Sequence, residues 1–308
     1  MTTRRKGIAG AAALIVLLAG GFVVWATVGD EVEQAEAAPS ATSTTTTASS
    51  TTSTTTTPLP PVDVDPTVTT IATAAVPLVT VFAQPPAEAV LDDRASAAGA
   101  SLAALVPATS PERADAPAIP TLQAPVVGRR STETGWEFDN PTPWGNPLTF
   151  VVTENHGEWL RVEMPVRPNG AEGWIRASDV TQSTLTTHVE IDLSDRTLKA
   201  WDGATLIAET QVVVGKNATP TPLGRLYVTD YEEKYSGSAY GPWILPLSGY
   251  SQQLDEFSGG VPVIAMHGTN RPELVGTASS NGCIRMPDAV IETLRAKLPI
   301  GTPVDTRD

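Results

Sequence analysis

Alternating hydrophobic and polar residues in the second half of the chain predict a protein that is mainly β-strand. Residues 148–153 alternate, and residues 158–164 alternate again after a turn at residues 155–157. A third short run follows at residues 173–175. Short strands joined by tight turns are typical of a small β-barrel, so we expect a barrel over residues 119–184.

The alternation resumes at His188 and predicts a second β-rich domain over residues 185–308. Asp202-Gly203 is a strong hairpin signal between two alternating runs. The apolar run 261–266 predicts a buried strand that ends at His267. Near the end of the chain, Pro287-Asp288 predicts the start of a short helix. Its apolar face would consist of Val290, Ile291, Leu294 and Leu298.

The first residues of the chain predict a membrane segment. Residues 7–28 contain no charged side chain and follow the basic residues Arg4, Arg5 and Lys6. An apolar run of about 20 residues can span a bilayer as a helix, and its basic flank stays in the cytoplasm. We therefore expect residues 1–30 to anchor the protein in the membrane, with the rest of the chain exported to the cell wall space. The alternative is a signal peptide cleaved near the Ala-Glu-Ala sequence at residues 35–37, which would release a secreted protein.

Residues 31–118 are predicted to form a disordered tether between the membrane segment and the barrel. Residues 39–57 consist almost entirely of Ser, Thr and Ala, and the following stretch stays rich in Ala, Pro, Thr and Val. Such a composition buries too little apolar surface to offset the conformational entropy of the chain.

Charge and composition exclude several classes of function. The formal net charge is −14, and no basic cluster lies outside the N-terminus, which argues against nucleic acid as a partner. Cys283 is the only cysteine, so the chain has no internal disulfide. One cysteine with His156, His188 and His267 offers no zinc-site spacing, and the Gly-x-Ser-x-Gly motif of serine hydrolases is absent. We expect neither a metal nor a cofactor.

Cys283 and His267 are the residues most suited to chemistry. A free cysteine titrates at about 8.5 and needs a partner to become a thiolate near neutral pH. His267 supplies such a partner if the glycine-rich loop between the two residues folds back, and Gly282 lets the backbone approach whatever Cys283 attacks. A lone cysteine is most often buried and inert, but these neighbours favour a reactive one.

These residues resemble the active-site signature of the YkuD-type L,D-transpeptidases, which remodel bacterial peptidoglycan. The resemblance rests on His267-Gly268 and on Ser-Asn-Gly-Cys-Ile-Arg at residues 280–285. Gly215-Lys216 and Thr-Pro-Thr-Pro-Leu-Gly at residues 219–224 resemble the first half of the same domain, so the likeness covers residues 188–305. One departure is Asn281, because the family usually has a second histidine there.

The resemblance implies roles for the residues of the motif. His267 would be the general base for Cys283, with its other ring nitrogen held by the backbone carbonyl of Gly268. Backbone N–H groups near Gly282 and Cys283 would stabilise an oxyanion. Ser280 would hydrogen-bond within the site or cap its own turn.

Asn281 and Arg285 would contact the substrate. Asn281, which replaces the usual histidine, bears on substrate positioning more than on the chemical step. Arg285 would bind a substrate carboxylate or hold the loop through backbone carbonyls, and the sequence leaves both roles open.

The irregular stretch 231–260 matches the part of the family that caps the substrate groove. By this resemblance Tyr240, Trp243 and Tyr250 are expected in a lid, although aromatic packing in the core is an alternative for each ring. The predicted barrel resembles the bacterial SH3-like modules that precede wall enzymes. That resemblance rests on four short stretches, which are residues 159–162, 167–170, 173–175 and 179–180.

By this resemblance the protein is expected to be a cysteine acyltransferase that acts on peptidoglycan tetrapeptide stems and forms 3→3 cross-links. Hydrolysis would instead make it an L,D-carboxypeptidase, and a protein acceptor would make it a protein-to-wall ligase. A non-catalytic wall-binding module is the alternative of another class. Cys283 would also be the site at which a carbapenem forms a covalent adduct.

Overall fold

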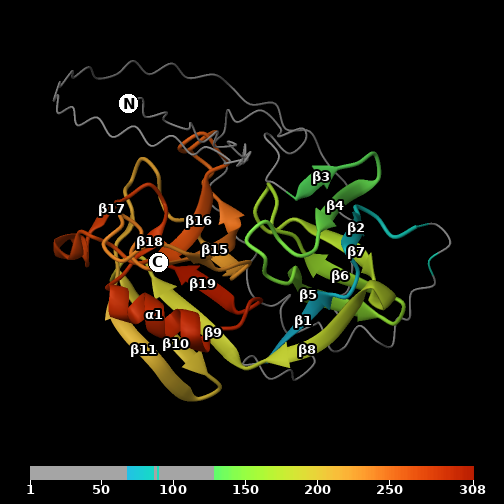
Figure 1. The fold of residues 1–308 in the computed structure, drawn as a ribbon, viewed down its shortest axis with the longest axis horizontal. Helices are drawn as coiled ribbons and strands as arrows, with labels where there is room; N and C mark the ends of the chain where they lie inside the picture. The colour runs from blue at the N-terminus through green and yellow to red at the C-terminus, as the bar shows by residue number, and fades with distance from the viewer. Residues whose placement is uncertain (1–67, 87–88, 90–127) are drawn as a thin grey trace, which may run out of the picture. The chain divides into compact units, whose positions relative to one another are not determined.

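The computed structural model describes residues 68–86, 89 and 128–308 (Figure 1). The predicted membrane segment over residues 1–30 and much of the predicted tether lie outside these residues. Within the described parts of the chain, no helix is both long enough and apolar enough to cross a membrane.

The first part of the described chain is an eight-stranded sheet in which every pair of neighbours is antiparallel. Its strand order is β3-β4-β2-β7-β6-β5-β1-β8. The strands are β1 (Thr69–Ala74), β2 (Leu78–Phe82), β3 (Arg129–Ser131), β4 (Gly135–Asp139), β5 (Thr149–His156), β6 (Trp159–Glu163), β7 (Glu172–Arg176) and β8 (Val180–Leu185). A short 3₁₀ helix, Ala177–Asp179, joins the last two. The strands enclose a hydrophobic cluster that includes Val79, Phe138, Phe150 and Leu160.

Two strands of this sheet lie within the stretch predicted to be a disordered tether, so that prediction is wrong for β1 and β2. β1 pairs with β5 and β8, and β2 pairs with β4 and β7. The side chains of Ile71, Val79 and Val81 are buried in the sheet. Neither strand shows a regular alternation of apolar and polar residues, and both lie in a sequence whose Ala, Pro and Thr content indicates disorder. Pairing with strands far along the chain provides the stability that this composition lacks.

The C-terminal region contains three further sheets and the one α-helix of the described residues. A five-stranded sheet has the order β11-β10-β9-β19-β13, and a four-stranded sheet has the order β14-β15-β16-β18. β12 (Val214–Gly215) and β17 (Ala278–Ser280) form a short parallel pair. The remaining strands are β9 (Thr187–Asp192), β10 (Thr197–Asp202), β11 (Thr205–Gln211), β13 (Gly224–Tyr227), β14 (Glu232–Glu233), β15 (Trp243–Tyr250), β16 (Val263–His267), β18 (Ile284–Arg285) and β19 (Pro303–Arg307).

The helix α1 (Asp288–Lys297) packs against the C-terminal sheets in the way its sequence predicts (Figure 1). Ile291, Leu294 and Leu298 are buried, and Val290 packs against the same cluster. This cluster also contains residues of the five-stranded and four-stranded sheets, such as Val189 and Met266. The prediction of a mainly β protein with one short C-terminal helix is confirmed.

The eight-stranded sheet and the C-terminal region belong to one compact unit and contact each other directly. Ile71 and Val151 of the sheet form a small hydrophobic cluster with Tyr227 of β13. The hydroxyl of Tyr227 donates a hydrogen bond to the carbonyl oxygen of Glu163 at 3.1 Å. The contact is therefore both apolar and hydrogen-bonded.

Candidate active site

Strands β16 and β18 place Cys283 and His267 on the same face of a sheet. The two strands pair in parallel, with Met266 beside Ile284 and His267 beside Arg285. Side chains alternate between the faces of a strand, and Met266 and Ile284 are fully buried in the core. His267 and Arg285 therefore face away from the core, and Cys283, which directly precedes Ile284, faces the same way.

The imidazole of His267 is held in one orientation by its own backbone neighbour. Its Nδ1 lies 2.6 Å from the carbonyl oxygen of Gly268, which can only accept, so Nδ1 carries the proton. Nε2 is then the unprotonated nitrogen that can accept a proton. The ring of Tyr240 packs edge-on against the imidazole, with centroids 5.0 Å apart. The predicted role of the Gly268 carbonyl thus has the geometry it requires.

Burial keeps both reactive groups neutral at rest. It lowers the pKa of His267 to about 4, against the opposing effect of the Gly268 hydrogen bond, and the charge of Arg285 lowers it further. Burial also raises the pKa of the Cys283 thiol, while a backbone hydrogen bond at Ala265 and the charge of Arg285 act in the lowering direction. Since a thiolate–imidazolium pair is disfavoured in this state, His267 suits general-base work at the moment of attack.

The thiol does not point its proton at His267 in this state. Its Sγ donates a weak hydrogen bond to the carbonyl oxygen of Val263 at 3.9 Å, and no hydrogen bond joins it to the imidazole among the described residues. A rotation about the Cα–Cβ bond would be needed to present the thiol to Nε2. Catalytic hydrogen bonds are often long or misaligned before substrate binds.

The loop before Cys283 is shaped by the hydroxyl of Ser280. The Oγ of Ser280 donates to the carbonyl oxygen of Cys283 at 2.6 Å and accepts from the N–H of Gly282 at 3.1 Å. Gly282 has φ of +115°, and a Cβ there would lie 2.8 Å from Ile264. The hydroxyl of Thr221 donates to the carbonyl oxygen of Gly282 at 2.8 Å. Ser280 is therefore a buried turn-forming residue.

The hydrogen bond of Gly282 narrows the predicted set of oxyanion donors. Its N–H is already bound to Ser280, so it is not free to bind an oxyanion. The N–H of Cys283 forms no hydrogen bond within the described part of the chain. It is the remaining donor of the two that the sequence indicated.

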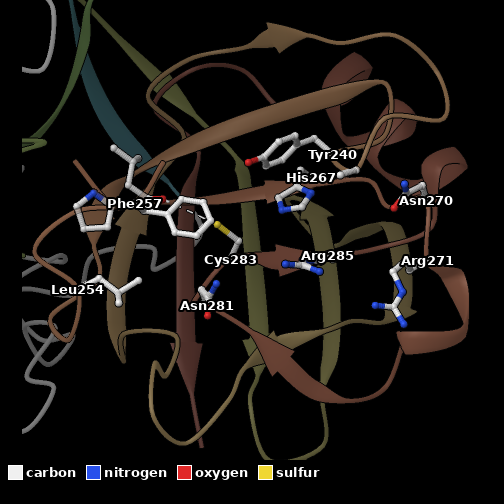
Figure 2. A pocket seen from close by; sticks show the side chains of 12 residues that line it. Tyr240, Leu254, Phe257, His267, Asn270, Arg271, Asn281, Cys283 and Arg285 are labelled. Atoms are coloured by element: carbon white, nitrogen blue, oxygen red, sulfur yellow. Dashed lines mark hydrogen bonds between the residues drawn. The ribbon is translucent and has the colours of Figure 1, made fainter. Parts of the chain in front are cut away.

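Cys283 and His267 line an open pocket with about 670 Å³ of empty space, part of it open to solvent. Figure 2 shows Cys283, His267 and Arg285 grouped at its centre, with Leu254 and Phe257 on one side and Asn270 and Arg271 on the other. The other lining residues are Ala239, Tyr240, Pro262, Val263 and Asn281.

Arg285 and Arg271 give this pocket a positive lining. Of the described residues that line it, none is acidic. The Nε of Arg285 is buried and has no hydrogen-bond partner within the described residues, whereas Arg271 pairs with Glu273 at 3.0 Å. Such a pocket suits a ligand that carries a carboxylate.

Two of the three residues expected in a lid do not reach the pocket. Tyr240 lines it, but Trp243 packs against the core with Arg295 stacked 4.8 Å from its ring centre. Tyr250 is buried, and its hydroxyl donates to the carbonyl oxygen of Pro165 at 2.6 Å. Both residues lie in strand β15, which the sequence did not reveal, so the lid prediction is wrong for Trp243 and Tyr250.

A second wall of the pocket follows β15, within and just after the stretch 231–260 that was expected to cap the groove, but it uses residues that the sequence did not single out. Leu254, Phe257 and Pro262 line the pocket from the loop between β15 and β16. Phe257 is 40% exposed. The apolar residues of this irregular loop were the available signal, because such residues in a loop often contact ligands.

Comparison with known proteins agrees with this geometry. Residues 186–305 match the family model of the YkuD L,D-transpeptidase catalytic domain. The matched stretch is similar to that domain and covers less than half of the chain. It contains both Cys283 and His267, and the eight-stranded sheet lies outside it.

The chain is similar to two named proteins from bacilli. The chain is 30% identical over 121 residues to the putative L,D-transpeptidase YkuD of Bacillus licheniformis and 29% identical over 121 residues to that of Bacillus subtilis. Each match covers 39% of this chain and 66% of the relative. The solution structure of the Enterococcus faecium L,D-transpeptidase catalytic domain acylated by ertapenem is 27% identical. That match covers 39% of this chain and 96% of the other, with a TM-score of 0.30.

Proposed function

We propose that this protein is a peptidoglycan L,D-transpeptidase that forms 3→3 cross-links through a thioester on Cys283. One observation carries the proposal. Cys283 and His267 face the same open pocket from adjacent parallel strands, and His267 is held with Nε2 free to take a proton. The match of residues 186–305 to the YkuD catalytic domain supports the choice of reaction.

In the first half of the proposed reaction, the stem peptide acylates Cys283. His267 Nε2 takes the thiol proton while Sγ attacks the carbonyl carbon of the amide that precedes the terminal D-alanine of a tetrapeptide stem. The N–H of Cys283 would stabilise the oxyanion. The C–N bond then breaks, and the imidazolium gives its proton to the departing D-alanine amine, which leaves a thioester.

In the second half, a side-chain amine of a neighbouring stem resolves the thioester. The amine attacks the thioester carbonyl, an amide forms and the C–S bond breaks. The proton that the amine loses passes through His267 to the thiolate, which restores the resting pair. We assign the carboxylate of the stem to Arg285, because its guanidinium lines the pocket and has a buried Nε without a partner among the described residues.

We further propose that residues 1–30 anchor the protein in the membrane, so that the catalytic domain acts in the cell wall space. The apolar run 7–28 behind three basic residues supports the anchor. We propose the eight-stranded sheet as an SH3-like module, which the short strands and turns between residues 159 and 180 support.

Intact mass spectrometry of the full chain tests the proposed function. The protein is incubated with a disaccharide-tetrapeptide and, separately, with a carbapenem, and the peptide products are separated and sequenced. We expect a covalent adduct on Cys283 in both cases and a 3→3 dimer with the tetrapeptide. The full chain is needed because β1 and β2 lie within the predicted tether.

The other outcomes separate the alternatives. An adduct with release of tripeptide alone would indicate an L,D-carboxypeptidase, and transfer of the stem to a protein amine would indicate a ligase. Cys283→Ala is the matched control, in which adducts must disappear while binding to isolated wall remains. Wall binding by the native protein without any adduct would contradict the enzymatic proposal and favour a binding module.

A further inference from the structure

A single peptide group connects His267 to a carboxylate that the mechanism above does not use. The carbonyl oxygen of Gly268 accepts the Nδ1–H of His267 at 2.6 Å, and the N–H of Thr269 donates to Oδ1 of Asp288 at 3.0 Å. That carbonyl and that N–H belong to the same peptide bond, which is trans. In a trans peptide the two groups point in opposite directions, so this peptide lies between the imidazole and the carboxylate.

The carboxylate of Asp288 is closely packed against two glycines. A Cβ built on Gly268 would lie 2.4 Å from Oδ1 of Asp288, and a Cβ built on Gly241 would lie at the same distance. Gly268 and Gly241 also approach each other, because a Cβ on Gly241 would lie 2.5 Å from the Gly268 Cα. A side chain at either glycine would therefore displace the carboxylate from Thr269.

No ion pair of Asp288 exists among the described residues. Its position in the first turn of α1 places it near the positive end of the helix dipole, which stabilises a carboxylate there. A purely structural explanation is therefore available, in which Asp288 only starts the helix.

We propose that Asp288 is a positioning residue that fixes the tautomer of His267 and supports its imidazolium form through the Gly268–Thr269 peptide. The inference rests on the proposed role of His267 as the general base. A hydrogen bond from Thr269 N–H to a carboxylate polarises the peptide and makes the Gly268 carbonyl a stronger acceptor, since linked hydrogen bonds reinforce one another. A buried carboxylate hydrogen-bonded directly to a catalytic histidine has the same two effects in serine proteases.

The protonation of His267 during the reaction shows when the hydrogen bond to Asp288 would stabilise it. Nδ1–H stays bound to the Gly268 carbonyl throughout, while Nε2 gains the Cys283 proton and later passes it to the leaving amine. The imidazole is positively charged only between these steps. Arg285 faces it from β18 and opposes that charge, the ring of Tyr240 packs against it, and among the described residues Asp288 is the acid linked to it through the Gly268–Thr269 peptide.

Two variants of the full chain test the proposal. Asp288→Asn keeps an oxygen that can accept from Thr269 but removes the charge, and Asp288→Ala removes both. The first readout is the ¹⁵N spectrum of the imidazoles, which is assignable because the chain has only three histidines. We expect His267 to be the Nδ1–H tautomer in the native protein and in Asp288→Asn, and a mixture of tautomers in Asp288→Ala.

The second readout is the rate of Cys283 alkylation by iodoacetamide between pH 5 and pH 9. We expect the His267-dependent part of the rate to fall about 10-fold in Asp288→Asn and about 100-fold in Asp288→Ala, within the range that general-base assistance covers. The alkylation rate of Gly268→Ala should fall as in Asp288→Ala, because its Cβ would occupy the space of the Asp288 carboxylate.

Glu292→Gln is the matched control, since Glu292 is an exposed acid on the same helix. Its alkylation profile should equal that of the native protein. Asp288 variants that melt at lower temperature but keep the native tautomer and alkylation profile would overturn the proposal and leave only the structural role. Alkylation needs no stem peptide, so a native protein with a His267-dependent profile but no tetrapeptide or carbapenem adduct would refute the proposed function and not this inference.

Discussion

The two walls of the pocket are built in different ways. The first wall, which we call the chemical wall, consists of Cys283, His267 and Arg285 on the paired strands β16 and β18. Their neighbours Met266 and Ile284 are fully buried in the core of the same region. The second wall, which we call the loop wall, consists of Leu254, Phe257 and Pro262 between β15 and β16.

The loop wall depends on contacts from the eight-stranded sheet. Arg167, in the turn between β6 and β7, donates from one nitrogen to the carbonyl oxygens of Ser251 and Leu254, each at 2.7 Å. Asn169 of the same turn exchanges two hydrogen bonds with the backbone of Tyr250, each at 2.9 Å.

This difference indicates that the two walls have separate roles, one in the chemical step and the other in substrate binding. Strand pairing and a buried core hold Cys283 and His267, so the proposed chemistry depends on residues 186–305 alone. The wall that the proposed substrate would touch is held partly by a region outside that stretch. Changes in the eight-stranded sheet should therefore alter substrate capture and leave the chemical step intact.

The largest effect is expected on the chemical wall. In His267→Gln, the pocket keeps a polar side chain but loses the base that takes the thiol proton. We expect the rate of Cys283 acylation by the tetrapeptide or a carbapenem to fall about 10³-fold at pH 7, which is a typical share for general-base assistance. Stopped-flow or quenched-flow acylation kinetics would measure it.

His188→Gln is the control for this variant. His188 stacks on Trp201 in the hairpin of β9 and β10, and neither residue lines the pocket. An acylation rate in His267→Gln equal to that of His188→Gln would contradict the assignment of the base.

A smaller effect is expected on the loop wall. Arg167→Ala removes two hydrogen bonds from a charged donor, and such bonds contribute about 1.5–3 kcal/mol each. If half of one bond is transmitted to the pocket, KM for the tetrapeptide rises about 3- to 10-fold, since 1.4 kcal/mol corresponds to a factor of ten. The acylation rate at saturating substrate should stay unchanged. Measuring the rate over a range of substrate concentrations separates the two quantities.

Arg130→Ala provides the comparison for Arg167→Ala. Arg130 lies in the same eight-stranded sheet but is exposed and pairs with Asp139 and Glu137 of the neighbouring strand. Its removal should change neither KM nor the saturating rate. A loss of the saturating rate in Arg167→Ala would show that the two walls are not independent.

The sequence predicts the chemical wall more fully than the loop wall, because local strand pairing builds the first wall and contacts from distant residues hold the second. Cys283, His267 and Gly268 act through local pairing and immediate neighbours, so a short motif contains most of the information. Asp288 was missed because it acts through a peptide group rather than by touching the histidine. The irregular stretch 231–260 was expected at the groove, but Leu254 and Phe257 were not singled out within it, because their loop has no periodicity and Arg167 holds it from far along the chain.

The fold was predicted where local alternation agreed with composition. The strands around His188, Thr197 and His267 and the helix at Asp288 follow from patterns of a few residues. β1 and β2 were missed because their composition indicates disorder and their stability comes from distant partners. Composition averages over a stretch and does not detect a five-residue strand within it.

The smallest effect on activity, but a measurable effect on stability, is expected at the contact between the two regions. Glu163 of β6 is buried there, and its Oε1 accepts a hydrogen bond from Ser248 of β15 at 3.3 Å. Burial raises the pKa of Glu163 to about 8, with the charge of Arg225 in opposition and those of Glu172 and Asp305 in support. Arg225 is itself paired with Asp305 at 3.0 Å.

A raised folded pKa means that the folded protein favours the protonated carboxyl. The stabilisation is complete below pH 4.5, the ordinary pKa of the group, and is lost as pH rises to about 8. Glu163→Gln keeps a neutral side chain of the same size, so its free energy of unfolding should exceed that of the native protein by about 2–5 kcal/mol at pH 9 and match it at pH 4. Denaturant unfolding of the full chain across this range would measure the difference. Glu158→Gln, at the exposed turn before β6, should keep the native pH dependence. If Glu163→Gln kept it too, Glu163 would be charged in the folded protein, and the contact between the two regions would not respond to pH through this residue.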